Sequence, residues 1–353
     1  MMINGCPRVG LLEQGATEVK LLEPETCGYR PEFLGDDQSL IVYIHLPLDG
    51  NRLLRVFSAA EGRSRSLGFT EGIVYRIAVD GNRVLALGAT PSSTRALRAF
   101  DAQTGEASIL ARGEGTGIES RLLKSFRTAT IPSFDGLAIP VRIFEPACRA
   151  SAQGPAVLLI HGSPRGKDDV PPRLSREIGY LLGRGITVIA PNYRGSTGHG
   201  ERLGQFSGIG SQVKDLVSVT HAAQTLPEIG NSPLHALGVC YGSEYLMIGL
   251  ARAAAESFRS LISWSGGGGP LLRLPPHHPE VLWIITARDG SLERINELDA
   301  DRYARLRQKT TLHPIDDTHM VLHGESRLSA LEAVSAFVEK KSGVQCAESF
   351  WDR

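Results

Sequence analysis

Short, wholly apolar runs alternate with helix-length segments over the last two thirds of the chain. The run AVLLI at 156–160 is followed by a predicted helix at 173–182, a predicted strand at 186–191 and a predicted helix at 212–226. Strands that lack polar alternation are buried on both faces, which is typical of parallel sheets. Because parallel strands need crossover connections, the helices between them cover the faces of the sheet. The sequence therefore predicts an α/β domain with a mainly parallel sheet and helices on both faces.

The same alternation continues through the rest of this region. The further predicted elements are strands at 234–239, 260–265, 280–286 and 311–315, and helices at 243–255 and 326–341. Ahead of all of them, a hairpin is predicted at 126–144. We therefore expect one α/β domain over residues 119–353, joined to the preceding part by the Gly-rich, polar segment 111–120.

The first part of the chain, residues 1–118, shows short apolar runs separated by turn signals. Asp49-Gly50-Asn51 and Asp80-Gly81-Asn82 are typical hairpin turns, since glycine and asparagine tolerate positive φ. The units repeat at roughly 30 to 40 residues, which is the spacing of propeller blades. About two or three units fit, whereas a closed propeller needs at least four blades. We expect a small antiparallel β region resembling a truncated propeller, with its open edges covered by the second domain or by another copy in a homo-oligomer.

Charge and composition narrow the classes of partner. The chain has 38 Lys and Arg residues and 38 Asp and Glu residues. This balance argues against a protein that binds nucleic acids or membrane surfaces. No apolar run reaches the about 18 residues of a membrane-spanning helix, and the first residues do not resemble a secretory signal. Five cysteines are dispersed without CxxC spacing, and the pair His277-His278 has no third metal ligand at suitable spacing. We expect a cytoplasmic protein with reduced thiols, no metal and no cofactor.

One pentapeptide supplies a candidate nucleophile. Gly238-Val239-Cys240-Tyr241-Gly242 closes an apolar strand and opens a predicted helix. In this context the spacing is typical of the nucleophile elbow of α/β-hydrolases, where flanking glycines permit a sharp turn. The turn would lift the Cys240 side chain above the sheet at a helix N-terminus, which favours the thiolate. The alternative is a small, buried and inert cysteine in a strand-to-helix turn.

Two further segments carry a resemblance to a known family. His161-Gly162-Ser163-Pro164 is similar to an HGGP turn, and residues 192–200, NYRGSTGHG, are similar to an NYRGSTGYG segment. With these segments, residues 121–342 resemble the catalytic domain of the prolyl oligopeptidase (S9) family, close to its acylaminoacyl-peptidase branch. The resemblance implies an α/β-hydrolase fold preceded by a propeller. The chain departs from that pattern in Cys240, which replaces a serine, in its shortened propeller-like part, and in a short connection between two strands.

The resemblance also implies partners for the nucleophile. In α/β-hydrolases the chain order is nucleophile, acid and histidine. Asp289 lies where the resembled family has its acid, and His319 lies where that family has its histidine. Asp289 has the alternative of a plain turn role beside a glycine. His313, inside a predicted strand, and His323, nearer the closing helix, are the rival histidines, for which packing or surface roles are expected.

Backbone amides are the expected stabilisers of a developing oxyanion. The elbow implies the N–H of Tyr241, directly after the nucleophile. The resemblance implies the N–H of Ser163, which stands at the second glycine of the HGGP turn. Tyr193 and Arg194 are expected to line the substrate site. Two roles are open to Arg194, which are contact with a substrate carboxylate and an internal ion pair.

The candidate Cys-His-Asp triad predicts an acyl-transferring or hydrolytic enzyme with a covalent acyl-thioester intermediate on Cys240. A thiolate leaves more readily than an amine, so we expect first an ester, thioester or activated acyl substrate, with hydrolysis, transfer and cyclisation all open. The substrate would be a small molecule, an acyl group on a carrier or a peptide. Two alternatives remain, which are a peptidase of short or N-blocked peptides and a non-hydrolytic protein that retains the fold.

Overall fold

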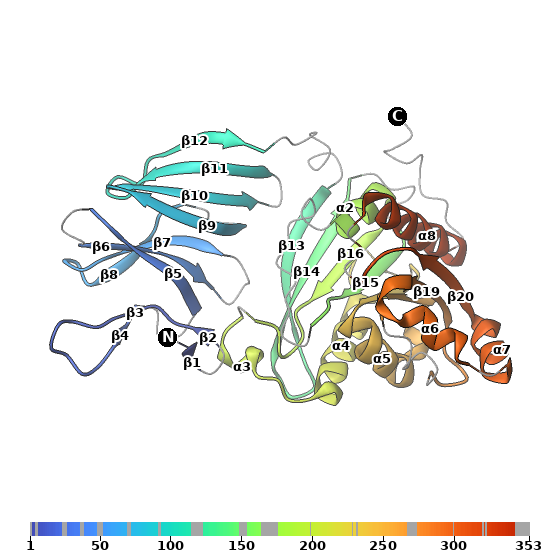
Figure 1. Ribbon diagram of the computed structural model, residues 1–353. Helices are drawn as coiled ribbons and strands as arrows, with labels where there is room; N and C mark the ends of the chain where they lie inside the picture. The colour runs from blue at the N-terminus through green and yellow to red at the C-terminus, as the bar shows by residue number, and fades with distance from the viewer. Residues whose placement is uncertain are drawn as a thin grey trace. The chain divides into compact units, whose positions relative to one another are not determined.

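The computed structural model describes two units of the chain, which are taken in turn (Figure 1). The described residues are 2–3, 6–22, 27–35, 39–47, 52–68, 72–90, 93–113, 123–147, 154–163, 176–197, 199–227, 229–230, 232–266, 274–298, 300–319, 321 and 323–342. The smaller unit contains residues 1–121 and the segment Ser196–Gln205. The larger unit contains most of the remaining chain, including the candidate nucleophile.

The larger unit is built on one eight-stranded sheet. Its strands are β13 (Leu123–Pro132), β14 (Ala138–Pro146), β15 (Ala156–Ile160), β16 (Thr187–Pro191), β17 (Leu234–Val239), β18 (Ser260–Trp264), β19 (Glu280–Thr286) and β20 (Thr310–Ile315). The strand order is β13-β14-β16-β15-β17-β18-β19-β20. The six strands β15 to β20 pair in parallel, and β13 and β14 form an antiparallel edge. The mainly parallel sheet expected from the apolar runs is confirmed.

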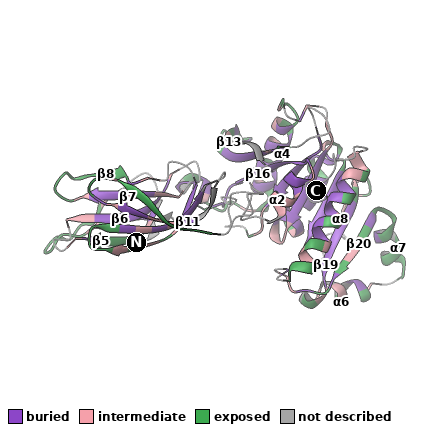
Figure 2. Cartoon of the chain, turned by 90° about the horizontal axis from the view of Figure 1, so that it is seen from above, coloured by how far each residue is buried: buried purple, intermediate pink, exposed green. Residues whose placement is uncertain are grey.

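Helices cover this sheet. They are α2 (Arg176–Gly183), α4 (Ile209–Ala223), α5 (Met247–Ala253), α6 (Ser291–Asn296), α7 (Ala300–Lys309) and α8 (Gly324–Ser342). A π-helical turn, η1 (Gly242–Leu246), precedes α5, and two 3₁₀ turns are η2 (Ala255–Ser257) and η4 (Ala287–Asp289). Helix α2 packs against α8, and α4 packs against α5. Figure 2 shows the central strands of this sheet as buried and α7 as largely exposed.

The apolar runs form the core because both faces of their strands are covered. Every residue of β15, β16 and β18 is buried. Burial of such side chains contributes about 25 cal/mol per Å² of apolar surface, which is the main favourable term in folding. Strand β17 lies between β15 and β18, so the residue that follows it emerges at the middle of the sheet edge. The fold therefore holds the position of Cys240 from both sides.

The smaller unit contains two four-stranded antiparallel sheets. The first consists of β5 (Cys27–Leu34), β6 (Leu40–Leu46), β7 (Leu53–Ser58) and β8 (Arg63–Ser66), and the second of β9 (Ile73–Asp80), β10 (Arg83–Thr90), β11 (Ser93–Asp101) and β12 (Ala107–Arg112). Two-stranded pairs join β1 (Met2–Ile3) to β2 (Cys6–Pro7) and β3 (Gly10–Leu11) to β4 (Lys20–Leu21). A short helix, α3 (Glu201–Gly204), also belongs to this unit. The two sheets are consistent with two blades of a partial propeller.

The two sheets of the smaller unit share an apolar core. Val42 and Leu54 from the first sheet pack with Val84 and Phe100 from the second. The opposite face of the first sheet is covered by the N-terminal residues, where Val9 and Leu11 contact Tyr43 and Phe57. The opposite face of the second sheet, which we call the outer face, carries Leu85, Leu87 and Leu97, all partly exposed.

Several sequence expectations differ from the structure in detail. The Gly81-Asn82 turn is confirmed, because Asp80 pairs with Arg83 and Gly81 has a φ of 57°. The Asp49-Gly50-Asn51 turn lies outside the described residues. Strand β12 continues to Arg112, so the expected linker begins later than residue 111. The helices α6 and α7 were not expected. Their short, charged sequences separate β19 from β20.

In the part of the chain that the structure describes, no helix has the length and apolar character required to cross a membrane.

Candidate active site

A strained turn follows the central strand β17. Cys240 has a φ of 52°, a left-handed conformation that side chains other than glycine rarely adopt. The Cys240 N–H donates to the Trp264 carbonyl at 2.9 Å, and the Cys240 carbonyl accepts from the Glu244 N–H at 2.9 Å. These two bonds hold the turn between β18 and the first helical turn. The Cys240 thiol is free and half-buried.

The two glycines of the pentapeptide are required by close packing. A Cβ on Gly238 would stand 2.7 Å from the Ser243 backbone, and one on Gly242 would stand 2.7 Å from the His161 carbonyl oxygen. Real Cβ atoms do not approach other heavy atoms so closely. The helix after the turn therefore starts directly against β17 and the end of β15. Its first turn is the π-helical η1, a departure from α geometry that is frequent at functional sites.

The loop after β15 lies beside the nucleophile turn. A Cβ on Gly162 would stand 3.1 Å from the Cys240 Cβ and 3.9 Å from its Sγ. The next residue, Ser163, has a φ of 63°, so its backbone is also strained. The Tyr241 amide lies at the start of the helix, where N–H groups lack intrahelical acceptors. The loop of Gly162 and Ser163 is thus packed directly against the turn that contains Cys240.

Tyr193 fastens the loop that contains Ser163. Its ring is fully buried and stacks on the His161 ring at 4.3 Å between centroids. Its hydroxyl donates to the His161 carbonyl at 2.8 Å and lies 3.4 Å from the Ser163 carbonyl. Burial, followed by the negative charges of ionised Tyr241 and Cys240, holds the pKa of the Tyr193 hydroxyl above its usual range. A neutral donor therefore supports the loop at any ordinary pH.

Arg194 is engaged in internal ion pairs. Its Nε and Nη2 donate to the two oxygens of Asp215 at 2.8 and 2.7 Å, and its Nη1 and Nη2 donate to Asp135 at 3.1 Å. The Arg194 side chain is 8% exposed and that of Asp215 is fully buried. The guanidinium lowers the pKa of the Asp135 carboxyl, chiefly by its hydrogen bond. Of the two roles open to Arg194, the structure supports the internal ion pair and gives no support to a substrate contact.

One buried side chain that the sequence did not indicate links these parts. Gln212 on α4 is fully buried, its Nε2 donates to the Arg194 carbonyl at 2.8 Å, and its Oε1 accepts from the Tyr241 hydroxyl at 2.7 Å. The residue after the nucleophile is thereby tied to the loop after β16. In the sequence, the only signal for Gln212 and Asp215 is that they stand three positions apart on one predicted helix. In the structure both side chains are buried and hold the loop after β16.

The turn that contains Asp289 is fastened to the loop that contains His319. The Arg288 N–H donates to the Asp317 carbonyl at 3.1 Å, and the Arg288 guanidinium pairs with the Asp316 carboxylate at 2.8 and 2.9 Å. The backbone of Asp289 closes η4, and its side chain lies outside the described residues. The segments of Asp289 and His319 are thus held together by contacts of Arg288 with Asp316 and Asp317.

The histidine loop is braced at both ends. The buried carboxylate of Asp317 accepts from the Thr318 N–H at 2.7 Å and the His323 N–H at 2.9 Å. Val321, with a φ of 47°, donates its N–H to the Thr318 carbonyl at 2.9 Å, and its own carbonyl accepts from Arg327 at 3.1 Å. His319, which is half-buried, lies inside this tight turn.

The rival histidines occupy different surroundings. His323 Nδ1 lies 3.1 Å from a carboxylate oxygen of Asp317, with 62% of the His323 side chain exposed. His313 Nε2 lies 3.0 Å from the Ser329 hydroxyl, and burial lowers the pKa of His313. His323 therefore has the carboxylate partner that a general base needs, and it remains an alternative to His319.

The predicted residues fall into two groups at one edge of the sheet. Cys240, Tyr241, Ser163 and Tyr193 form the first group, and the Asp289 turn with the His319 loop forms the second. Strands β17, β19 and β20 are parallel neighbours or near neighbours, and each of these segments follows the carboxyl end of its strand. In α/β sheets, ligands bind outside the carboxyl ends of the strands. The candidate residues therefore lie at the edge of the sheet where such ligands bind.

Comparison with solved structures identifies proteins of the same fold. A puromycin-hydrolysing peptidase of Mycobacterium tuberculosis matches with a TM-score of 0.75 and 19% identity, over 93% of this chain and 57% of that chain. A puromycin hydrolase matches with a TM-score of 0.72 and 17% identity, over 97% and 59%. An acylaminoacyl peptidase in complex with Z-Gly-Gly-Phe-chloromethyl ketone matches with a TM-score of 0.69 and 16% identity, over 94% and 58%. No known family model matches the sequence.

These likenesses extend over nearly all of the chain but over less than three fifths of each neighbour. At such identities they show a shared fold, which combines a hydrolase-like mixed sheet with antiparallel sheets. The fold implied by the HGSP and NYRGSTGHG segments is therefore confirmed at this level.

Proposed function

We propose that this chain is a hydrolase of the prolyl oligopeptidase type that cleaves amide bonds of short or N-blocked peptides, with Cys240 as its nucleophile. The observation that carries the proposal is the left-handed turn at Cys240, between a buried strand and a helix and against the loop of Gly162. A strained residue in this position is the signature of a nucleophile elbow. The names of the neighbours of this fold, which include puromycin hydrolase and acylaminoacyl peptidase, support amides as the substrate class.

The reaction would proceed in two balanced steps. In the first, the Cys240 sulfur bonds to the carbonyl carbon, the thiol proton passes to the imidazole of His319, and the carbonyl π electrons move to the oxygen. The N–H groups of Tyr241 and Ser163 would stabilise that oxyanion. The C–N bond then breaks, the amine takes the proton from the imidazolium, and an acyl thioester remains on Cys240. In the second step, water gives its proton to the imidazole, attacks the thioester and releases the acid with regeneration of the thiol.

Proton delivery decides which substrates the thiol accepts. A thiolate leaves a tetrahedral intermediate more easily than an unprotonated amine, so amide cleavage depends on an imidazolium oriented by a carboxylate. We assign that orienting role to Asp289. Esters and thioesters need less help from the acid, and we expect them to react as well. The first expectation from the sequence favoured these activated substrates. The neighbours support peptides ahead of them.

Mass spectrometry of the intact protein tests the covalent step. Incubation with a p-nitrophenyl ester or an acetyl-aminoacyl p-nitroanilide is expected to add one acyl group to the wild type and none to Cys240→Ala. A Cys346→Ala variant serves as the matched control and is expected to acylate as the wild type does. Loss of the nucleophile should lower turnover about 10³-fold or more.

Two outcomes would overturn the proposal. One is the absence of an acyl adduct on Cys240 with amide, ester and thioester substrates alike, which would leave a protein that shares the fold without the covalent chemistry. The other is unchanged turnover in Cys240→Ala. A rate profile with iodoacetamide gives an independent measurement, because an activated Cys240 should react faster than the other four cysteines.

A further inference from the structure

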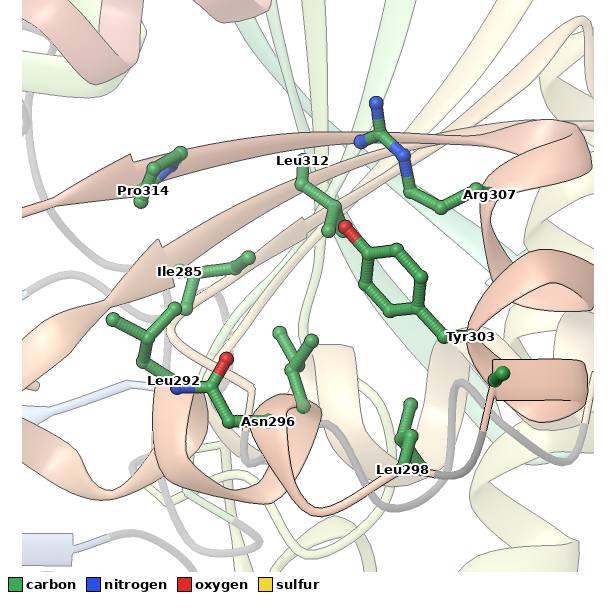
Figure 3. A pocket seen from close by; sticks show the side chains of 10 residues that line it. Ile285, Leu292, Asn296, Leu298, Tyr303, Arg307, Leu312 and Pro314 are labelled. Atoms are coloured by element: carbon green, nitrogen blue, oxygen red, sulfur yellow. The ribbon is translucent and has the colours of Figure 1, made fainter.

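We propose that a pocket between α6, α7 and the strands β19 and β20 binds a small amphipathic monocarboxylate. The pocket has a volume of about 600 Å³. This volume is within the range of small-molecule sites in proteins, which is about 300–1,000 Å³. Figure 3 shows its lining, which comes from both helices and both strands.

The pocket exists because two short helices cover the end of the sheet. Helix α6 has 6 residues and α7 has 10, and Leu298 lies in the connection between them. The floor is formed by Ile285 of β19 and by Leu312 and Pro314 of β20, with Leu292 of α6 at the side. Ile285 is buried, whereas Pro314 is exposed. The body of a ligand would therefore meet an apolar surface that opens to solvent.

Polar groups stand on the helical side of this apolar surface. Tyr303 and Arg307 of α7 and Asn296 of α6 line the pocket. Figure 3 shows the Tyr303 ring lying across the pocket with its hydroxyl toward Leu312, and the Arg307 side chain beside it. Within the described part of the chain, no carboxylate pairs with Arg307, unlike Arg194 and Arg288, which both have acidic partners. A guanidinium beside an apolar cavity thus has its donors available.

The chemistry of these groups selects the ligand class. A guanidinium presents two parallel N–H donors that match a carboxylate, and such charge-assisted bonds are about twice as strong as neutral ones. The Tyr303 hydroxyl adds a neutral donor on the side of Arg307, whereas Asn296 lies on the other side of the pocket (Figure 3). An aliphatic or aromatic body would displace water from Ile285, Leu292 and Leu312. A cation or a polyanion fits less well, because Arg307 is the cationic side chain among the described lining residues and most of that lining is apolar.

This pocket is separate from the candidate active site. None of its lining residues belongs to the two groups around Cys240 and His319. Its lining reaches Ile285 and Pro314, the next-to-last residues of β19 and β20, so it lies near the segments that follow these strands. A ligand here would be an effector or a bound product and would not undergo the reaction.

Calorimetric titration of the full chain with octanoate tests the proposal. We expect saturable binding of one octanoate, and weak or no binding of octanol and octylamine, which share the body but lack the carboxylate. Arg307→Gln should weaken octanoate binding about tenfold or more, since it removes a charged hydrogen-bond partner. Arg252→Gln, on α5 and outside the pocket, is the matched control and should bind as the wild type does.

A second variant fills the cavity and leaves the charge in place. Ala300 lines the pocket at the exposed start of α7, so Ala300→Phe should abolish octanoate binding without loss of the thermal unfolding transition. Equal binding of octanoate and octanol, equal binding by Arg307→Gln and wild type, or no saturable binding at millimolar octanoate would each overturn the proposal. Because binding is measured without turnover, failure here is distinguishable from failure of the proposed hydrolytic activity.

Discussion

Gly162 lies so close to Cys240 that a Cβ on residue 162 would stand 3.1 Å from the Cys240 Cβ and 3.2 Å from the Val239 carbonyl oxygen. This contact is tighter than nine in ten real Cβ contacts, so one of the two segments must shift to admit a methyl group. The candidate nucleophile and the expected oxyanion loop therefore pack directly against each other. A larger side chain at residue 162 should therefore shift the position of the Cys240 thiol.

The substitution Gly162→Ala should lower the rate of Cys240 acylation about tenfold or more, with a loss of about 1 kcal/mol in the free energy of unfolding. Gly210→Ala on α4 is the matched control, because a Cβ there meets no atom within 4 Å. That variant should gain about 0.5–1 kcal/mol, as helical glycines replaced by alanine do, and keep its acylation rate. Acylation kinetics and urea unfolding measure both quantities. Equal acylation rates in the two variants would contradict the shared packing.

His319→Ala and His323→Ala separate the two candidate bases. If His319 transfers the proton, its loss should lower amide turnover about 10²–10⁴-fold, the usual contribution of a general base. His323→Ala should cost less than about tenfold, because the His323 side chain is 62% exposed and its contact with Asp317 supports the loop. Steady-state kinetics on an acyl-aminoacyl p-nitroanilide give the comparison. The reverse order of effects would transfer the role to the Asp317–His323 pair.

Gln212 should act as a positioning residue for the nucleophile turn. Gln212→Ala removes the partner of the Tyr241 hydroxyl, and Tyr241→Phe removes the same hydrogen bond from its other end while keeping the backbone amide. We expect a coupling of about 1 kcal/mol between the two changes in a double-mutant cycle on the free energy of unfolding. A reduced kcat with an unchanged KM in each variant would mark an effect on the turn. Additive effects on stability would show that the bond does not join the two elements.

His235 should make stability fall as pH decreases. It is buried in β17, and burial, with a smaller effect of Arg259, lowers its pKa to about 3. The unfolded chain takes up a proton at this residue below about pH 6.5, whereas the folded chain does so only near pH 3. The free energy of unfolding should therefore decrease from about pH 6.5 downward, by up to about 1.4 kcal/mol per pH unit from this group.

Urea unfolding between pH 7 and pH 5 measures this slope. His235→Gln should reduce it, while His277→Gln, at an exposed histidine, should leave it unchanged. An identical slope in the wild type and His235→Gln would contradict the assignment.

The outer face of the second small sheet should mediate association of two copies. Its residues Leu85, Leu87 and Leu97 are partly exposed, and two sheets fall short of the four blades that close a propeller. We expect light scattering during size exclusion to give a dimer for the wild type and a monomer for Leu87→Lys. Phe33→Lys, at an apolar residue that is 53% exposed on β5, is the control and should remain dimeric. A monomeric wild type would exclude this association.

The sequence predicted the elements whose burial is uniform. Strands β15, β17 and β19 match the apolar runs at 156–160, 234–239 and 280–286, because each is buried along almost its whole length and ends at a turn. Helices α6 and α7 escaped prediction, since α7 is exposed along much of its length and carries few apolar residues to set a period. The pocket beneath these helices could not be predicted either, because it depends on how the two short helices pack on the sheet.

For the candidate site, the motifs predicted the sharp turn at Cys240 but not the residues that support it. The Gly238 and Gly242 spacing predicted a sharp bend, and the left-handed conformation of Cys240 agrees with it. The contacts of Arg194 with Asp215, 21 residues away, join separate elements and leave no local pattern. For that reason the internal role of Arg194 could be named as an alternative but not chosen from the sequence.

The backbone hydrogen bond from the Arg288 N–H to the Asp317 carbonyl joins the segment of Asp289 to the segment of His319. The two segments follow different strands, β19 and β20, and this hydrogen bond couples a displacement of one to the other. A shift of the turn at Ala287–Asp289 would therefore be transmitted to the segment that leads to His319.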